Sequence, residues 1–308
     1  MRWEKMGLVY GPDGSLPWAQ SHAMIPTPVT LNSDVVRVFI TCCDAQGISR
    51  PGYVDISAHD PLKVLRVSES PLLDIGQSGT FDENGVLACS VIKLDDGRMF
   101  MYYAGFELGT KIRYRLLTGL AVSTNNGETF ERYSTTPILE RTPDELFFRG
   151  GPCCLFEGGR FRLWYVAGST WTNIDGKPMP VYEVRYAEST DGIHWPSKGC
   201  TQIEISDSDE HGFGRPYVSK KLDGSYQMHY SVRRRSLAAY RLGYATSPDG
   251  KSWQRQDEQL NLDVSPSGFD SDAIMYAVPF EMGGETYLFY NGNNFGSQGF
   301  AVARLETA

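Results

Sequence analysis

Several features are scarce or missing in this sequence, and each absence excludes a class of protein. No apolar run approaches the roughly 20 residues that a transmembrane helix needs, and the opening stretch MRWEKMGLVYGPDG lacks the apolar core of a secretory signal. We therefore expect a cytoplasmic protein without a membrane partner. The net charge is -8 and the only basic run is Arg233 to Arg235, so a nucleic-acid partner is not expected.

Disulfide and metal-site spacings are also absent. The six cysteines include two adjacent pairs, Cys42 with Cys43 and Cys153 with Cys154, and all except Cys200 lie in apolar, strand-like sequence. This pattern indicates buried reduced thiols instead of a disulfide framework. The histidines show no ligand spacing, so the sequence predicts no metal site and no cofactor.

A fivefold internal repeat is present. Five aromatic and β-branched segments start roughly 60 to 65 residues apart, a spacing suited to a four-stranded propeller blade with generous loops. They are VRVFITCC, MFMYYAG, FRLWYVAG, YQMHYSVR and TYLFYNGN, starting at Val36, Met99, Phe161, Tyr226 and Thr286. Each is preceded by a second strand-like segment, and four of these pairs are joined by glycine-containing turns typical of hairpins.

The last repeat predicts how the fold closes. It has only three strand-like segments before the C-terminus, whereas WEKMGLVY, residues 3 to 10, resembles the outer strands of the other repeats. We therefore predict an all-β, single-domain protein over residues 1–308. The expected fold is a five-bladed β-propeller of four-stranded antiparallel blades, closed by the N-terminal strand.

Polar residues gather where the innermost strands are expected to begin, at the mouth of the central channel. The candidate catalytic carboxylates are Asp82, Glu83, Glu210, Asp270 and Asp272. The candidate ligand-binding residues are His22, Asp44, Arg50, Asn84, Arg149, Trp171, His211, Arg215, Arg233, Asn291 and Asn293. Such a mixture suits sugar hydroxyls and an anionic group. Each residue also has a structural alternative, as a solvated loop residue or as an ion-pair partner that joins neighbouring blades.

Six motifs carry a resemblance to a known family: SHAMIPTP, FDENGV, NIDGKPMPVYEVRYAESTDGIHW, GRPYV, YRLGYATSPDG and FDSDAIMY followed by YLFYNGN. Over nearly the whole chain they resemble glycosidase-like five-bladed propeller proteins of bacterial surface-polysaccharide gene clusters. More distantly, the chain is similar to the arabinanase and xylosidase, invertase and levansucrase, and mannoside phosphorylase families. The resemblance implies an active site at the channel mouth.

One departure from these families leaves three interpretations open. The arabinanase and invertase families place a catalytic aspartate at the start of the first inner strand, where this chain has Ser21 and His22. The first interpretation is a glycosidase with Glu83 or Asp82 as acid, Asp272 or Asp270 as base, and Arg149, Arg215 and His211 holding an anionic sugar. The second is a phosphorylase that takes inorganic phosphate. The third is a protein that binds a glycan or a sugar nucleotide without turnover.

Overall fold

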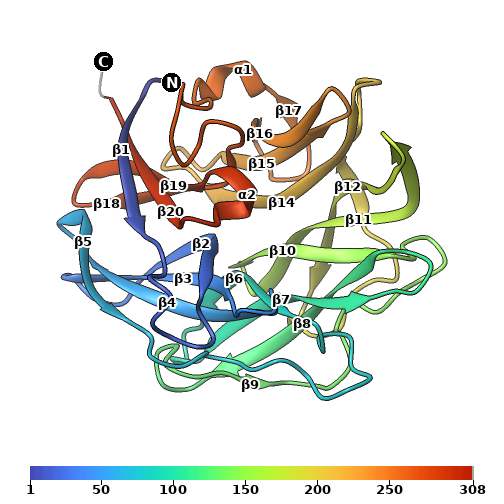
Figure 1. The fold of residues 1–308 in the computed structure, drawn as a ribbon, viewed down its shortest axis with the longest axis horizontal. Coiled ribbons are helices and arrows are strands. Elements are labelled where there is room, and N and C mark those ends of the chain that lie inside the picture. The colour runs from blue at the N-terminus through green and yellow to red at the C-terminus, as the bar shows by residue number, and fades with distance from the viewer. Residues whose placement is uncertain (307–308) are drawn as a thin grey trace.

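The computed structural model describes residues 1–306, which form 20 strands and two four-residue helices (Figure 1). The first half contains β1 (Trp3–Tyr10), β2 (Ser21–Thr30), β3 (Val35–Cys43), β4 (Ser49–Ser57), β5 (Asp60–Val67), β6 (Val86–Lys93), β7 (Met99–Leu108), β8 (Tyr114–Ser123), β9 (Glu131–Arg132) and β10 (Phe148–Glu157). The second half contains β11 (Arg160–Ile174), β12 (Lys177–Ser189), β13 (Cys200–Ile203), β14 (Glu210–Lys220), β15 (Tyr226–Arg234), β16 (Leu237–Ser247), β17 (Gln254–Arg255), α1 (Asp257–Leu260), β18 (Met275–Met282), β19 (Glu285–Asn291), α2 (Asn293–Gly296) and β20 (Phe300–Leu305).

Most strands pair antiparallel with the next strand along the chain. One sheet has the order β2-β3-β4-β5, and another has the order β1-β20-β19-β18. A twelve-stranded sheet contains three antiparallel groups, β6 to β9, β10 to β13 and β14 to β17. Only short parallel pairings join these groups, between β8 and β10 and between β12 and β14. The strand β1 lies antiparallel to β20, which places the two ends of the chain together.

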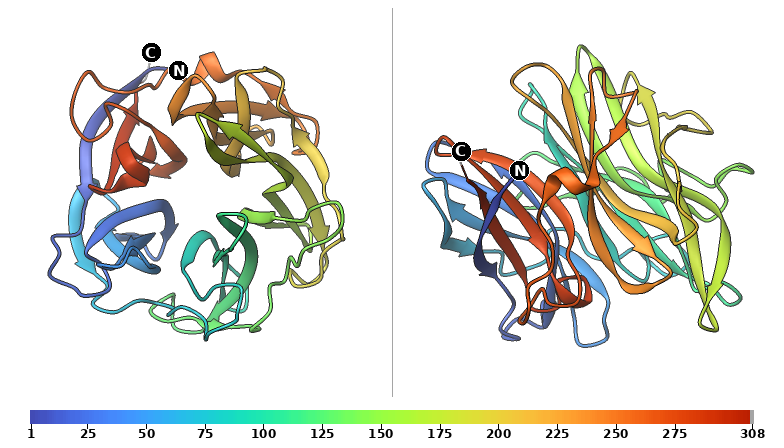
Figure 2. Two further views of the ribbon diagram at one scale, coloured as in Figure 1. Left: turned by 45° about the vertical axis from the view of Figure 1, so that its right-hand side comes forward. Right: turned by 90° about the horizontal axis from the view of Figure 1, so that it is seen from above.

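The first strand of each group lies toward the middle of the molecule. Strand β2 contacts β6 and β18, and β14 contacts β10 and β18. Figure 2 (left) shows the strand groups arranged around a common centre, with the chain ends at one edge. The beginnings of β14 and β18 therefore lie near each other although more than 60 residues separate them in sequence.

Aromatic side chains fill the space between the strand groups. Phe39 of β3, Phe81 and Tyr103 of the next group, and Phe130 belong to one buried cluster. Glycines make room for these rings: a Cβ at Gly119 would lie 2.2 Å from the Tyr103 ring. Because interiors are close-packed, the tyrosine on the second strand and the glycine on the third strand require each other.

Two local expectations are answered by the structure. All six cysteines are free, and every one except Cys200 is buried. The repeat pattern also predicts an outer strand in WQRQDEQLNL, which starts at Trp253. The structure has only a two-residue strand there, β17 (Gln254–Arg255), and helix α1 follows it. The reason lies in Asp257, whose carboxylate accepts hydrogen bonds from the Tyr230 hydroxyl at 2.5 Å and from the Tyr244 amide at 2.9 Å, and so turns the chain. Within the described residues, no helix is long and apolar enough to cross a membrane.

Candidate functional site

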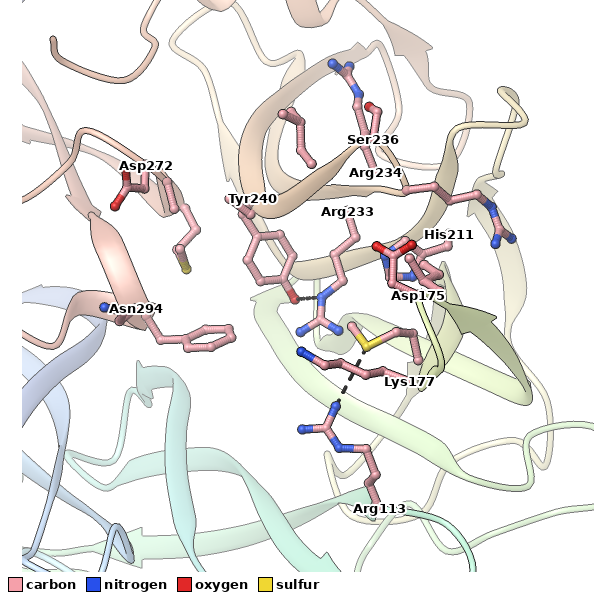
Figure 3. Close-up of a pocket in the computed structure, with 18 residues that line it drawn as sticks. Arg113, Asp175, Lys177, His211, Arg233, Arg234, Ser236, Tyr240, Asp272 and Asn294 are labelled. Carbon is pink, nitrogen blue, oxygen red and sulfur yellow. Dashed lines mark hydrogen bonds between the residues drawn. The ribbon is translucent and has the colours of Figure 1, made fainter.

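A cavity of about 670 Å³ lies where β14 and β18 begin. Its walls come from the tip of the β11–β12 hairpin, the end of β15 with the start of β16, the segment that leads into β18, and helix α2 (Figure 3). This volume is within the range of pockets that bind small organic ligands. We therefore take this cavity as the candidate functional site.

The wall of the cavity carries more positive than negative charge. Its charged side chains are the five cations Arg113, Lys177, Arg233, Arg234 and Arg235 and the two carboxylates Asp175 and Asp272. Among residues 1 to 306, none of these five cations has a carboxylate oxygen within the 4.0 Å of an ion pair. The uncompensated cations favour an anionic ligand.

Arg233, a predicted site residue on β15, is held by tyrosines instead of by a carboxylate. Its Nε donates a hydrogen bond to the Tyr240 hydroxyl at 2.5 Å. The guanidinium carbon lies 4.7 Å from the ring centre of Tyr240 and 5.7 Å from that of Tyr182. These rings stabilise the positive charge without neutralising it. Neither Nη group forms a hydrogen bond within 3.5 Å to a described residue, so both can serve a ligand.

His211, another predicted site residue, lines the same cavity from β14. Its Nδ1 lies 3.2 Å from the Pro180 carbonyl oxygen, so the Nδ1–H donates and Nε2 is left as the acceptor. Burial lowers the pKa of His211; the Pro180 carbonyl opposes this shift, and the nearby Arg233 guanidinium adds to it. The imidazole is therefore neutral at pH 7.

The two aspartates before β18 have different surroundings. Asp272 is exposed and lines the cavity, and its backbone N–H donates to the Asn293 side-chain oxygen at 2.7 Å. Asp270 is only 1% exposed; it accepts Lys5 Nζ at 2.6 Å and the Tyr290 hydroxyl at 3.2 Å. Asp272 is thus free to meet a ligand, whereas Asp270 joins β1 to β19.

Two more of the predicted acids have structural partners. Asp82 is fully buried and accepts Arg132 Nε at 2.8 Å and the Tyr103 hydroxyl at 3.1 Å. Glu210 is buried against Arg255, whose two terminal nitrogens donate to its oxygens at 2.7 and 3.0 Å. Neither carboxylate lines the cavity. Bidentate pairing of this kind holds a carboxylate in one orientation.

Another buried acid, Glu145, was not among the predicted site residues. It accepts the Tyr165 hydroxyl at 2.9 Å and Arg185 at 2.9 Å, and it forms an ion pair with Arg149 at 2.5 Å. Arg149 also donates to the carbonyl oxygens of Glu140 and Pro196. Arg149 was predicted to bind an anionic ligand, but its guanidinium already has partners within the protein. Acids occur at or shortly before the inner strands of the second to fifth repeats, and this recurrence is the signal that would have found Glu145.

Three of these buried acids, Asp82, Glu145 and Asp270, belong to a unit that repeats with the fold, and the half-buried Asp257 takes the same place in the fourth repeat. In four repeats the second strand carries a tyrosine whose hydroxyl meets a carboxylate, and a cation from a neighbouring segment pairs with that carboxylate. These tyrosines are Tyr103, Tyr165, Tyr230 and Tyr290. The first repeat has Ile40 at this position. Only Asp272 among the five predicted catalytic acids lines the cavity.

Arg215, predicted to hold an anion, is a buried cation in the centre of the molecule. It is 3% exposed, and it donates to the Cys89 carbonyl oxygen of β6 at 2.9 Å and to Thr27 Oγ1 of β2 at 3.0 Å. Burial lowers its pKa. No hydrogen-bond partner for its Nη1 occurs in the part of the chain that the structure describes. Its contacts join the inner strands, and it does not line the cavity.

The predicted residues of the first two repeats lie outside the cavity lining. The carboxylate of Asp44 pairs with Arg50 at 2.7 Å, and Arg50 also pairs with Asp74 at 2.6 Å. The ring Nδ1 of His22 lies 2.8 Å from Ser21 Oγ.

Two predicted residues of the FDENG segment, Glu83 and Asn84, accept hydrogen bonds from backbone amides. Glu83 accepts the Gly79 amide at 2.7 Å, and Asn84 accepts the Leu108 amide at 3.0 Å. Neither Glu83 nor Asn84 lines the cavity, so the structure does not place the predicted acid Glu83 beside Asp272.

The three remaining predicted residues support the site or lie beside it. Trp171 packs 5.6 Å from the Tyr114 ring and 5.4 Å from the Phe148 ring, outside the cavity lining. The side chain of Asn291 accepts the Ile25 amide at 2.8 Å. Asn293 positions the Asp272 segment through the hydrogen bond to its backbone.

Most residues that line the cavity were not predicted as ligand-binding residues. Among them are Asp175, Lys177, Tyr240 and Phe295. Asp175 and Lys177 flank the glycine turn of the long β11–β12 hairpin, in the segment NIDGKP. A DG turn with charged neighbours indicates a hairpin. Whether the tip of this hairpin extends to the cavity depends on the length of its two strands. Among the described residues, no group of three or more His, Cys, Asp or Glu side chains could hold a metal ion.

Comparison with known proteins gives relatives over the full length. The chain is 34% identical over 306 residues to "Uncharacterized protein Rv1502" of Mycobacterium tuberculosis (strain ATCC 25618 / H37Rv), covering 99% of this chain and 100% of that protein. It has the same identity and coverage with "Uncharacterized protein MT1551" of Mycobacterium tuberculosis (strain CDC 1551 / Oshkosh). No family model matches the chain.

Solved structures show what the fold resembles. A structure described as "Glycoside hydrolase" has a TM-score of 0.76 at 19% identity, covering 99% of this chain and 92% of that one. A thermostable family-43 glycoside hydrolase has a TM-score of 0.68 at 19% identity, with coverages of 95% and 92%. A member of the GH130 family of mannoside phosphorylases has a TM-score of 0.66 at 16% identity, with coverages of 99% and 94%. The expected all-β fold of the β-propeller class is confirmed at this level.

Proposed function

We propose that this chain, which belongs to the family of the mycobacterial protein Rv1502, has a glycoside-hydrolase-like function. In this proposal it acts on a glycosidic bond of an anionic sugar that is bound in the cavity. The observation that carries the proposal is the cavity itself, which combines one accessible strand-entrance carboxylate, Asp272, with cations that lack ion-pair partners among the described residues. Hydrolysis of a glycosidic bond needs carboxylates beside the scissile bond, and an anionic sugar needs cations nearby.

Asp272 is the residue that we propose as a catalytic carboxylate. The second carboxylate that lines the cavity, Asp175, projects from the β11–β12 hairpin, and Figure 3 shows it on the other side of Arg233 from Asp272. A substrate between them would have a carboxylate on two sides, as an acid and a base require. This assignment replaces the expected use of Asp82, Asp270 and Glu210, whose carboxylates have structural partners.

The arrangement of strands supports a finer proposal about the fold. We propose five blades, of which the fifth is completed by β1 of the N-terminus beside β20, β19 and β18. In this arrangement the cavity lies at the mouth of the central channel. A role in bacterial surface-polysaccharide metabolism and a cytoplasmic location belong to the same proposal, and they rest on the family resemblance.

A phosphorylase is the second candidate, favoured by one observation. Only one predicted catalytic acid, Asp272, lines the cavity, together with a surplus of cations. Inorganic phosphate would then take the place of water as the attacking group. In that case cleavage requires added phosphate, whereas hydrolysis does not.

The experiment is a cleavage assay with nitrophenyl glycosides of neutral hexoses and hexuronic acids, each with and without inorganic phosphate. We expect release of nitrophenol by the native protein and a loss of at least tenfold in Asp272→Asn. Asp95→Asn is the matched control, because Asp95 is an exposed turn residue that does not line the cavity. Binding of these glycosides without release from any of them would contradict the enzymatic proposal and favour a glycan-binding protein.

A further inference from the structure

Three of the cations that line the cavity come from three separate parts of the chain. Arg113 lies between β7 and β8, Lys177 begins β12, and Arg233 lies near the end of β15. Figure 3 shows the charged ends of all three directed into the same cavity. We call Arg113, Lys177 and Arg233 the cationic cluster. Its members are brought together only by folding, so local sequence composition does not account for it.

The cluster has no internal counter-charge. No residue among those described forms an ion pair with any of the three side chains, whereas the buried Arg149 and the half-buried Arg255 have carboxylate partners. Arg113 lies instead against an apolar side chain, with its Nη1 3.7 Å from Met179 Sδ. Like charges that share a cavity repel each other, and an anion in the cavity removes that repulsion.

The number and kind of donors define the anion. The open Nη groups of Arg233 form a fork that matches two oxygens of a tetrahedral or planar anion, and Lys177 and Arg113 can approach from two other directions. A phosphoryl group offers three acceptor oxygens and a charge of about -1.5 to -2, whereas a carboxylate offers two oxygens and a single charge. The five cations of the cavity wall outnumber the carboxylates Asp175 and Asp272, and this net positive charge attracts a dianion more strongly than a monoanion.

We propose that the cationic cluster binds a phosphoryl dianion, carried by the sugar substrate or supplied as free phosphate. This inference rests on the proposed carbohydrate function, since it names the charged group of that substrate. The aromatic pair Tyr240 and Phe295 lines the adjacent wall with ring centres 6.0 Å apart, which suits the apolar face of a sugar ring. Where the sugar carries the phosphoryl group, the substrate class is therefore a sugar phosphate.

The test is isothermal titration calorimetry with four probes: a hexose 1-phosphate, inorganic phosphate, the matching hexuronate and the neutral hexose. We expect the phosphate-bearing probes to bind at least tenfold more tightly than the other two. Tighter binding of the hexose 1-phosphate than of inorganic phosphate identifies the sugar as the source of the phosphoryl group. Equal binding of these two probes identifies free phosphate as the source.

Three variants make the result specific. Arg233→Gln and Lys177→Gln should each weaken phosphate binding at least tenfold, and Arg233→Lys should recover only part of the loss because an ammonium group lacks the planar fork. Lys177 is exposed, so its substitution tests the cluster without disturbing the core. Arg160→Gln is the control: it removes the same charge at the opposite end of the β11–β12 hairpin, where Arg160 is exposed.

Two results would separate this inference from the proposed function. If hexuronate or neutral glycosides bind and are cleaved while the phosphate probes bind no tighter, the phosphoryl inference is wrong and the carbohydrate function stands. If inorganic phosphate binds through Lys177 and Arg233 but no glycoside binds or is cleaved, the phosphoryl site stands and the glycosidase proposal fails. Phosphate binding that is unchanged in both glutamine variants would also overturn the inference.

Discussion

Replacing Asp270 and Asp272 by asparagine, one at a time, should separate stability from ligand handling within three residues of sequence. Asp270 is buried and pairs with Lys5, so Asp270→Asn removes one partner of an ion pair. Such a loss costs about 3 to 5 kcal/mol when both groups are fully buried. The Lys5 side chain is 25% exposed and can regain water, and asparagine can still accept the Tyr290 hydroxyl. We therefore expect a destabilisation of about 2 to 3 kcal/mol.

Asp272→Asn should have the opposite profile. Its carboxylate is exposed and makes no ion pair with another described residue, so the free energy of unfolding should change by no more than about 0.5 kcal/mol. Ligand affinity or activity should fall at least tenfold, which corresponds to roughly 1.4 kcal/mol.

The assays are urea denaturation followed by tryptophan fluorescence and titration with the cavity ligands named above. A double-mutant cycle with Lys5→Met gives a further check, because the second substitution should cost less once Asp270 is changed. The reasoning would be refuted if Asp270→Asn unfolded at the same urea concentration as the native protein, or if Asp272→Asn lost stability and kept full ligand affinity.

Three further predictions concern groups away from the cavity. His229 is buried with both ring nitrogens unpaired among the described residues, and burial lowers its pKa to about 3. Below pH 6.5 the unfolded chain protonates His229 and the folded protein does not, so the free energy of unfolding falls as the pH is lowered. His229→Phe should remove about 2 kcal/mol of the stability that is lost between pH 8 and pH 5. Urea denaturation at both pH values measures this difference. Glu145→Gln should destabilise the protein by about 3 kcal/mol because Arg149 and Arg185 lose their shared carboxylate, and an unchanged thermal midpoint would contradict this. Thiol titration of the native protein should detect one reactive cysteine, Cys200, and all six after denaturation, since the other five are buried.

The strand pattern could be predicted because it depends on local chemistry. Alternation of apolar residues and glycine turns such as those at Glu157 and Met282 operate within about ten residues, so the repeated hairpins follow directly from the sequence. The sequence also predicted that the N-terminal strand pairs with the last repeat, and in the structure β1 pairs with β20. The helix α1 was missed because its turn depends on Asp257 meeting Tyr230, a contact between two separate segments of the chain.

The candidate site was less predictable because a charged side chain can pair with a residue that is distant in sequence. The sequence by itself determined that acids and arginines lie at the strand entrances. Only the tertiary structure decided which of them remain available: Lys5 reaches Asp270 from 265 residues away, and Arg132 reaches Asp82 from 50 residues away. The same applies to the cavity, because Arg113 and Lys177 lie beside separate turns and only folding brings them to one wall. Charge pairing depends on separation in space, and separation along the chain does not determine it.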